Sequence, residues 1–490
     1  MADTEKLDNR TKWSYSIGAT GRDAAYALVS MYLMSYIQYT MNLTVAQFAA
    51  IGAIVVVCMI WDAINDPLMG IIIENCHMKM GKYRPWILMG SVLNALIIVL
   101  MFTIRPAGWL FVIFFGLSYL CWGMTYTMND IAYWGMLPSL TSDAKERNGL
   151  VTLMGIFICV GQFSVAGIVP EVIAGNAVGA YRIVAMIVAL GFILFQALTV
   201  IGVKEKHHAA EDNVDKLGLK DMFRILGRND QLIPAGISSL FFNIGNGLLI
   251  MFGINFFYFE FGYTNGGNMV FLFTVMYGLG TLLSEFAFPL LTNHFKRKSL
   301  LTFFSVFTCV CYFVFLLTGY VPFIPKNPIL INIVGFLIFF SQGVLNMLII
   351  VMLNNTIEYD EYKFNERHDS IISTVRSFSA KLSGAINQGI VNLTLIISGI
   401  YAISQNISRL EVEAAEGLVL KENVLIQADS YIASTAPQQL FVLRLGITLF
   451  PMIAILISFV ILFKKYKIDE VKYERLLKEI RAKKFDYCEK

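Results

Sequence analysis

Two carboxylates in an apolar stretch are the first residues that could do chemistry. Asp62 and Asp66 are four residues apart, directly after the apolar run 51–60. This spacing places them on one face of a helix, one turn apart, and Asn65 can add an amide oxygen to the same volume. Carboxylates at membrane depth are costly unless they face protein, water or a cation. Because oxygen donors suit a hard ion, the pattern predicts a site for a monovalent cation or a proton and not for a transition metal.

A second polar set lies in the apolar segment near 109–135. Tyr126, Asp130 and Trp134 are spaced by four, so two aromatic rings and a carboxylate share one helical face. Proteins hold sugars in this way, because a carboxylate accepts hydroxyl hydrogen bonds while a ring packs on the apolar face of the sugar. A helix-packing stripe with one internally paired aspartate explains the pattern equally well, and both interpretations stay open at this point.

Three further charged residues in apolar segments are candidates for the same ligand. Asp23 follows Arg22 and precedes Tyr26 by one turn, which suits either a substrate contact or an intrahelical ion pair. Arg376 and Lys381 share another apolar segment, and a lysine this deep needs a carboxylate or a cavity. Lys381 could instead snorkel to the membrane edge; its candidate partners are Asp62, Asp66 and Asp130.

Two charged connectors are candidates for gating. The turn 81–86 carries Lys82 and Arg84, and anchoring of a helix at the membrane surface explains these residues without any gating role. The connector that follows the apolar segment near 329–355 is denser in charge. It can be a solvated loop or a latch of salt bridges between two domains, with Glu358, Asp360, Lys363 and Arg367 as its members.

The elements that carry these residues are membrane helices. The chain has 490 residues, of which 57% are hydrophobic and 15% charged, and its mean hydropathy is +0.63. Apolar segments of roughly 20 residues, the length that crosses a bilayer as a helix, recur from end to end. We therefore predict an all-α polytopic membrane protein with twelve helices, near 14–40, 44–74, 85–105, 109–135, 150–172, 180–202, 232–260, 268–292, 299–320, 329–355, 371–402 and 438–463.

The connectors predict orientation and domain organisation. Lys and Arg gather at the N-terminus, in the even-numbered connectors and in the tail, which places both termini in the cytoplasm. Two six-helix bundles of the major facilitator type follow from the long central loop. The predicted parts are a bundle over 1–202, the loop 203–231, a bundle over 232–463 that includes a long external loop at 403–437 with a short surface helix, and a tail over 464–490.

Other function classes lack support in the sequence. The net charge of +3 is small and concentrated in connectors, so no nucleic-acid partner is expected. The seven cysteines form no metal-ligand array, and there is no P-loop, His/Glu metal motif or nucleophile triad. We therefore expect no enzyme, no catalytic residue, no cofactor and no metal beyond a coupling cation.

Taken together, the motifs at 61–67, 81–87, 126–134 and 358–363 resemble the glycoside–pentoside–hexuronide:cation symporter family, the family of melibiose permease. The resemblance extends over essentially the whole chain. It implies that Asp62, Asn65, Asp66 and Thr127 form the cation site. It also implies that sugar contacts come from Asp23, Tyr126, Asp130 and Trp134, with Lys381 near both sites.

The chain departs from melibiose permease in one respect. The family member has a sugar-binding arginine in its fifth helix, and the matching position here is Gly155. The stretches 149–155 and 373–376 instead resemble the lactose/raffinose-type branch of the family. Many proteins of that branch carry a C-terminal phosphotransferase-like domain, which we expect to be absent because this chain ends at Lys490.

The expected protein is a secondary active symporter in the cell membrane that imports a glycoside by alternating access. A galactoside-type di- or oligosaccharide is the expected cargo, with Na⁺ or H⁺ as the coupling ion and Li⁺ as a further candidate. Its expected partners are the glycoside, the cation and the lipid bilayer, and a monomer is expected. The alternatives are another cargo (a pentoside, a hexuronide or a lysolipid) or a membrane sugar sensor without transport.

Overall fold

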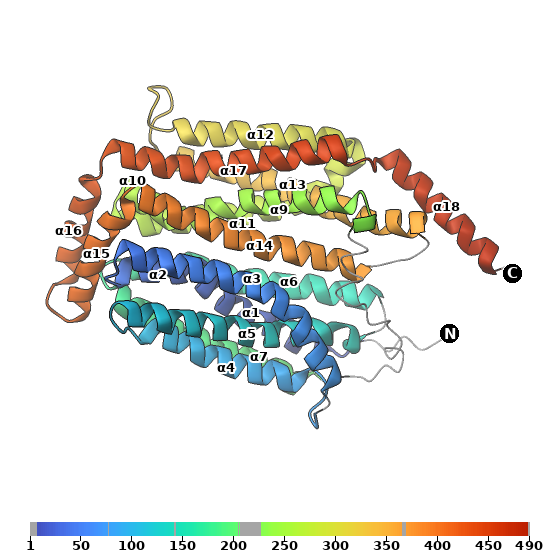
Figure 1. The fold of residues 1–490 in the computed structure, drawn as a ribbon, viewed down its shortest axis with the longest axis horizontal. Coiled ribbons are helices and arrows are strands. Elements are labelled where there is room, and N and C mark those ends of the chain that lie inside the picture. Colours follow the sequence, from blue (N-terminus) through green and yellow to red (C-terminus); the bar gives the residue numbers. More distant parts are fainter. Residues whose placement is uncertain are drawn as a thin grey trace. The chain divides into compact units, whose positions relative to one another are not determined.

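The computed structural model describes residues 7–76, 78–141, 144–203, 205, 227–364 and 369–488 (Figure 1). Contacts divide the chain into two compact units. The first unit consists of Met1–Val214, Ile254–Thr274 and Asn392–Leu440. The second unit consists of Asp215–Gly253, Val275–Val391 and Phe441–Lys490. Of the loop predicted at 203–231, residues 204 and 206–226 lie outside the described part of the chain, and the two-bundle division stays a prediction.

The first unit is built on the helices of the first 202 residues. They are α1 (Asn9–Ala27), the π-helical turn η1 (Leu28–Tyr32), α2 (Leu33–Thr40), α3 (Val45–Asn75), α4 (Arg84–Thr103), α5 (Trp109–Leu140), α6 (Ala144–Ile173) and α7 (Ala177–Gly202). Most of α10 (Gly253–Phe261), the start of α11 (Tyr263–His294), α15 (Ile400–Ala415) and α16 (Lys421–Ala433) join them.

Packing in the first unit brings α3 against α5, and a buried core joins α1 to α5. α1 packs on α6 and α7, while α5 packs on α3 and α4. Close approach of α1 and α6 depends on Gly161, where an added Cβ would lie 2.2 Å from the carbonyl oxygen of Thr20. Tyr15 and Tyr133 stack at 4.5 Å between ring centroids within the buried core that joins α1 to α5.

The start of α3 is fixed by its own sequence. The Thr44 hydroxyl accepts a hydrogen bond from the Gln47 amide at 3.3 Å, and the Gln47 side chain accepts one from the Thr44 amide at 2.9 Å. This reciprocal capping satisfies two amide groups that a helix otherwise leaves unpaired at its N-terminus. The register of α3, and with it the direction of Asp62 and Asp66, is therefore set from its first turn.

The second unit contains the remaining helices. They are α9 (Leu232–Met251), most of α11, α12 (Arg297–Leu317), α13 (Pro328–Phe364), most of α14 (Asp369–Ile397), most of α17 (Pro437–Lys465) and α18 (Glu470–Cys488). α13 packs against α9, α12 and α18. Hydroxyl pairs tie the helices together, with 2.7 Å between Ser238 and Ser458 and 2.6 Å between Thr308 and Ser341.

Ten helices of the described part are long and apolar enough to cross a membrane. Residues 375–397 and α15 would make an eleventh span if counted together, but they are bent by 88° at Gly399, whose φ of +75° is left-handed. The segment 9–40 is helical but carries buried Arg22 and Asp23. All twelve predicted segments are thus helical, the class of helical membrane protein is confirmed, and the count of twelve spans stays a prediction.

The long connector predicted at 403–437 contains two helices. α15 and α16 occupy most of it and pack on each other (Figure 1). The bend at Gly399 ends the preceding span at Ile397, a few residues before the predicted end at 402. α15 also packs on α2 and α7, so these two helices form a cap over one end of the first unit.

Candidate functional site

The residues predicted to bind a cation meet where α3 packs on α5. The Thr127 hydroxyl donates a hydrogen bond of 3.1 Å to Oδ1 of Asp66. One turn away on both helices, the Asp62 carboxylate lies against Gly123, where an added Cβ would be 2.6 Å from Oδ1. Asn65 is buried on α3, with 8% of its surface exposed. The spacing of four residues on α3 therefore matches the spacing of four on α5.

The donor set of this interface is made of oxygen atoms. Two carboxylates and a hydroxyl are ligands that suit a hard cation, and either carboxylate can accept a proton. Within the described ranges, no group of three or more His, Cys, Asp or Glu side chains is placed to hold a metal ion. The oxygen donors at α3 and α5 match the predicted site for a cation or a proton, and binding there stays a prediction.

A second cluster centres on Arg22 of α1, which is 2% exposed. Its guanidinium forms ion pairs with Asp23 at 2.7 Å and with Asp130 of α5 at 3.2 Å. The same guanidinium lies over the rings of Tyr133 at 4.7 Å and Trp134 at 5.4 Å. The intrahelical ion pair considered for Asp23 is therefore present, and it extends across to α5.

One side of the Arg22 cluster is accessible. The side chain of Asp130 is 35% exposed and Trp134 is 40% exposed, whereas Asp23 is buried. Asp23 also accepts a hydrogen bond of 3.3 Å from the Gln162 amide of α6. Buried Asp23 thus fixes Arg22, while Asp130 and Trp134 retain surface for a ligand.

Aromatic rings from α1 and α5 extend this cluster toward the cation ligands. Tyr26 lies 5.1 Å from Tyr126 and 6.2 Å from Trp122, measured between ring centroids. Trp122 and Tyr126 are 5.8 Å apart and stacked. Tyr26 is 41% exposed, so the wall of rings has an accessible face on which a sugar could pack.

Arg376 and Lys381 lie on α14 in the second unit. Arg376 is exposed and Lys381 is partly buried. The predicted proximity of Lys381 to the residues of the first unit stays a prediction. Gly155, at the position of the family arginine in the fifth helix, borders open space, since an added Cβ would meet no atom within 4 Å.

The turn that carries Lys82 and Arg84 is held by a carboxylate that the sequence did not single out. Glu205 accepts hydrogen bonds from the backbone amides of Lys82 at 2.7 Å, Tyr83 at 3.0 Å and Arg84 at 2.8 Å. The Arg84 side chain donates to the Val200 carbonyl at 2.8 Å. These contacts anchor the start of α4 on the end of α7, and the gating role of Lys82 and Arg84 stays a prediction.

The charged end of α13 is bound to residues just before α9, within the second unit. Asp360 is 2% exposed and lies 3.3 Å from Arg228, and Lys363 lies 2.8 Å from Asp230. Although burial raises the pKa of Asp230, hydrogen bonds from Lys363, Gln231 and Tyr359 outweigh it and lower that pKa to about 2. Of the other predicted members of this connector, Glu358 is partly buried and Arg367 lies outside the described residues.

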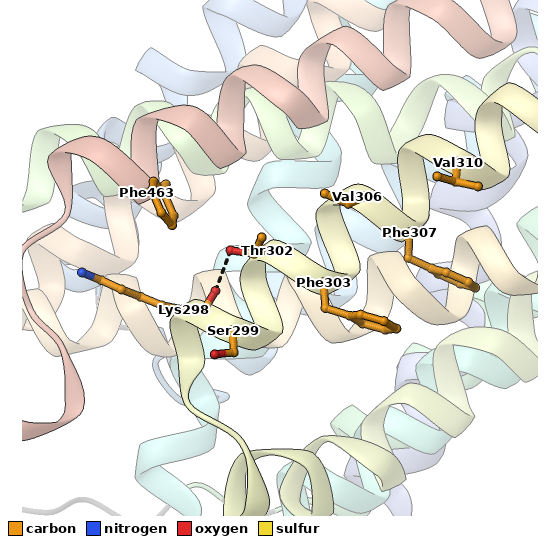
Figure 2. Close-up of a pocket in the computed structure, with 8 residues that line it drawn as sticks. All are labelled: Lys298, Ser299, Thr302, Phe303, Val306, Phe307, Val310 and Phe463. Atoms are coloured by element: carbon orange, nitrogen blue, oxygen red, sulfur yellow. Dashed lines mark hydrogen bonds between the residues drawn. The ribbon is translucent and has the colours of Figure 1, made fainter.

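A groove of about 690 Å³ lies on α12 and α17 (Figure 2). It is open and mostly apolar, and no residue predicted to bind sugar or cation lines it. Its lining consists of Lys298, Ser299, Thr302, Phe303, Val306, Phe307, Val310 and Phe463.

Two known proteins are similar to most of this chain. Lactose permease of Lactobacillus helveticus is 28% identical over 411 residues, which cover 79% of this chain and 62% of that protein. The raffinose carrier protein of Pediococcus pentosaceus is 26% identical over 405 residues, with coverages of 79% and 62%. This chain therefore spans less than two thirds of the length of these two relatives.

The architecture also has counterparts among solved structures. The crystal structure of a D-xylose-proton symporter superposes with a TM-score of 0.61, at 14% identity, and the match covers 88% of this chain and 98% of that one. At this identity the likeness shows a shared fold alone.

A family model described as MFS/sugar transport protein matches residues 14–470. The match extends from α1 to the start of α18 and includes α3, α5 and α14, which carry most of the candidate residues. The proteins of this comparison are membrane transporters and not enzymes. The chain belongs to the MFS/sugar transport protein family.

Proposed function

We propose that this chain is a secondary active symporter that imports a neutral glycoside together with Na⁺ or H⁺. The observation that carries the proposal is the sharing of α5 by two clusters. Thr127 of α5 contacts Asp66, and Asp130, three residues further on, contacts Arg22. Because both clusters use one helix, a cation bound at one changes the position of groups at the other, and such linkage between two binding events is reciprocal.

The cation acts by neutralising charge. Asp62 and Asp66 carry two negative charges at the α3–α5 interface, and binding of an ion compensates part of that charge. Thr127 then keeps its position beside Asp66, with Tyr126 and Asp130 oriented from the same helical turn. A sugar that contacts Tyr126, Asp130 and Trp134 therefore binds more tightly to the cation-loaded protein.

The charge of the Arg22 cluster favours a neutral cargo. One guanidinium faces two carboxylates, Asp23 and Asp130, so the three groups sum to a charge of −1. An anionic hexuronide would meet this negative charge, whereas sugar hydroxyls can donate to the accessible oxygens of Asp130. The polar surface likewise argues against a lysolipid. Lactose and raffinose, named in the two relatives, both contain a galactosyl group, which supports a galactoside-type di- or oligosaccharide.

In the proposed cycle the bundles predicted over 1–202 and 232–463 rock about the sugar site and expose it alternately to either side. The proposed location is the cell membrane, with both termini in the cytoplasm as the distribution of basic residues suggests. Lys381 of α14 would approach the carboxylates when the cation is absent. The proposed functional form is a monomer.

The test is uptake of labelled glycosides into vesicles under an imposed Na⁺ or H⁺ gradient. We expect accumulation against the sugar gradient for a galactoside, and loss of accumulation when an ionophore dissipates the ion gradient. Saturable binding without accumulation would instead identify a sugar sensor. Preferential uptake of a pentoside, a hexuronide or a lysolipid would replace the proposed cargo.

The Asp66→Asn variant tests the coupling step. It removes a cation ligand, so concentrative uptake should disappear while sugar binding or exchange is partly retained. Glu285→Gln is the matched control. Glu285 is exposed on α11 and belongs to neither cluster, so this substitution also removes one negative charge but leaves both clusters intact. Concentrative uptake by Asp66→Asn at the rate of this control would show that the cation does not bind at Asp66.

A further inference from the structure

A fully buried carboxylate lies at the capped end of the first unit, apart from the two clusters described above. Glu411 of α15 is 0% exposed. Its Oε1 accepts hydrogen bonds from the Gly175 amide at 2.7 Å and the Tyr263 hydroxyl at 2.7 Å. Its Oε2 accepts one from the Ala177 amide at 2.6 Å. Both oxygens of a carboxylate that has lost its water are therefore satisfied by protein donors.

The three donors come from outside α15. Gly175 lies in the turn between α6 and α7, Ala177 is the first residue of α7, and Tyr263 begins α11. Gly175 has a left-handed φ of +80°, and a Cβ on it would lie 2.7 Å from the Lys421 side chain of α16. The turn is thus shaped to fit beneath the α15–α16 cap, with its amides directed at Glu411.

Other polar contacts at this end join α15 to the first helices of the chain. Gln405 accepts a hydrogen bond from the Leu43 amide at 2.9 Å and donates one to the Gln38 carbonyl at 3.1 Å. The Tyr401 hydroxyl donates to the Leu43 carbonyl at 3.0 Å, and its ring stacks on Phe48 at 4.1 Å between centroids. Hydrogen bonds that water could replace therefore join α15 to residues 38–43.

One residue of α10, Asn255, makes further hydrogen bonds at this end of the first unit. Asn255 accepts hydrogen bonds from the Gln38 side chain at 2.7 Å and from the Tyr39 hydroxyl at 2.8 Å. Gln38, Asn255, Gln405 and Glu411 are all buried or partly buried. A polar interface of this kind can open without a large cost in free energy, because water replaces the protein partners of each group. Purely apolar packing would not separate so readily.

Burial raises the pKa of Glu411 above its ordinary value, although the hydrogen bonds from Ala177, Tyr263 and Gly175 and the charge of Lys421 oppose that rise. The carboxylate has three hydrogen-bond donors when the cap is closed, and water can supply donors once the cap has opened. It is poorly satisfied in between, when the donors have moved but water has not entered. A group with this property favours two discrete positions of the cap.

We propose that Glu411 is the central acceptor of a gate, in which the α15–α16 cap closes one end of the first unit and must release Gly175, Ala177 and Tyr263 for that end to open. The role of this gate in a transport cycle rests on the proposed function. The opening of the cap does not rest on it, because opening concerns only the cap and the helices that it covers.

The experiment measures how often the cap opens. Ser404 is fully buried on α15, so a Ser404→Cys reporter, in full-length protein whose native cysteines are replaced by serine, reacts with a membrane-permeant maleimide only when the cap lifts. In proteoliposomes, Glu411→Gln should speed this labelling at least tenfold, because an amide cannot accept all three hydrogen bonds. Tyr263→Phe, which removes one donor and keeps the ring, should give a smaller increase.

Two controls separate gate opening from general loosening. Glu413→Gln removes a carboxylate from the same helix at a position that is only partly buried, and labelling should stay at the wild-type rate. A Ser91→Cys reporter on α4, also fully buried, should react no faster in Glu411→Gln than in the parent protein. Faster reaction at both reporters would mean loss of structure and would overturn the gate.

The remaining outcomes also decide the proposal. Unchanged labelling of Ser404→Cys in both Glu411→Gln and Tyr263→Phe would show that the carboxylate does not hold the cap closed. Faster labelling at Ser404→Cys alone supports the gate even if no glycoside is transported, in which case the proposed cargo is wrong and the gate stands. Glycoside transport together with unchanged labelling of Ser404→Cys would mean that the gate is wrong and that the proposed function stands.

Discussion

Arg22 satisfies three demands at once: it compensates Asp23, reaches Asp130 across the α1–α5 interface and packs over two aromatic rings. A planar guanidinium can serve both carboxylates because its donors are arranged as a fork. A lysine has one ammonium group and could not pair with both in the same geometry. The identity of this residue therefore matters beyond its charge.

Arg22→Gln should destabilise the protein by about 3 kcal/mol, since it leaves a buried carboxylate without its partner. Arg22→Lys should fall between this variant and the wild type. Thermal unfolding in detergent measures the effect, and Arg182→Gln, exposed on α7, is the control. Equal unfolding midpoints for Arg22→Gln and the control would mean that the ion pairs add nothing to stability.

Asp230 and Lys363 predict a pH dependence in the second unit. The pKa of Asp230 is lowered from its ordinary 3.8 to about 2, so the pair stabilises the fold above pH 4 and this contribution is lost as the pH falls from 4 to 2. Because both side chains are more than one third exposed, the effect should stay below about 1 kcal/mol. Asp230→Asn should unfold at a lower temperature than wild type at pH 7 but not at pH 2. In a Lys363→Gln background, Asp230→Asn should no longer lower the unfolding temperature at pH 7. A gap that persists at pH 2 would exclude this pair as its origin.

At the scale of elements, α5 is the shared wall of the two clusters. Gly123 lets the Asp62 carboxylate approach its backbone, and Thr127 and Asp130 follow within two turns. α3 can present both carboxylates only because α5 has a glycine and a hydroxyl in matching positions. The geometry of the proposed cation site is therefore a property of a helix pair and not of either helix.

Gly123→Ala tests this pairing. The new Cβ would lie 2.6 Å from Oδ1 of Asp62 and must displace the carboxylate, so the apparent cation affinity should fall about tenfold, equivalent to roughly 1.4 kcal/mol. Gly191→Ala on α7 is the control, since a Cβ there meets no atom within 4 Å. The measurement is the cation concentration that gives half-maximal uptake. Equal values for the two variants would rule out a cation ligand role for Asp62 in this geometry.

At the scale of the whole molecule, the distribution of basic residues makes a prediction about topology. We expect the turn between α15 and α16 to face the outside and the end of α17 to face the cytoplasm. A membrane-impermeant maleimide should label Leu418→Cys in intact cells and Lys465→Cys only after permeabilisation. Leu418 and Lys465 are both exposed, so neither site is protected by packing. The reverse pattern of labelling would invert the proposed orientation.

The sequence alone was sufficient for the class of protein, the positions of the helices and the motif of Asp62, Asn65 and Asp66. A bilayer demands long apolar helices, and the distance between residues four apart on a helix is fixed locally. The resemblance added Thr127, whose hydroxyl is indeed in contact with Asp66. The bend at Gly399 was not predicted, because a single glycine between two apolar segments is compatible with a straight helix.

Tertiary structure decided what the charged residues pair with. Asp130 binds Arg22 across two helices, Glu205 caps a turn that precedes it by more than 120 residues, and Glu411 accepts from Gly175, 236 residues earlier in the chain. Each of these carboxylates could have faced water, a ligand or another helix, and its sequence neighbours do not choose among them. Burial makes the choice, since a carboxylate removed from water must find donors wherever packing brings them.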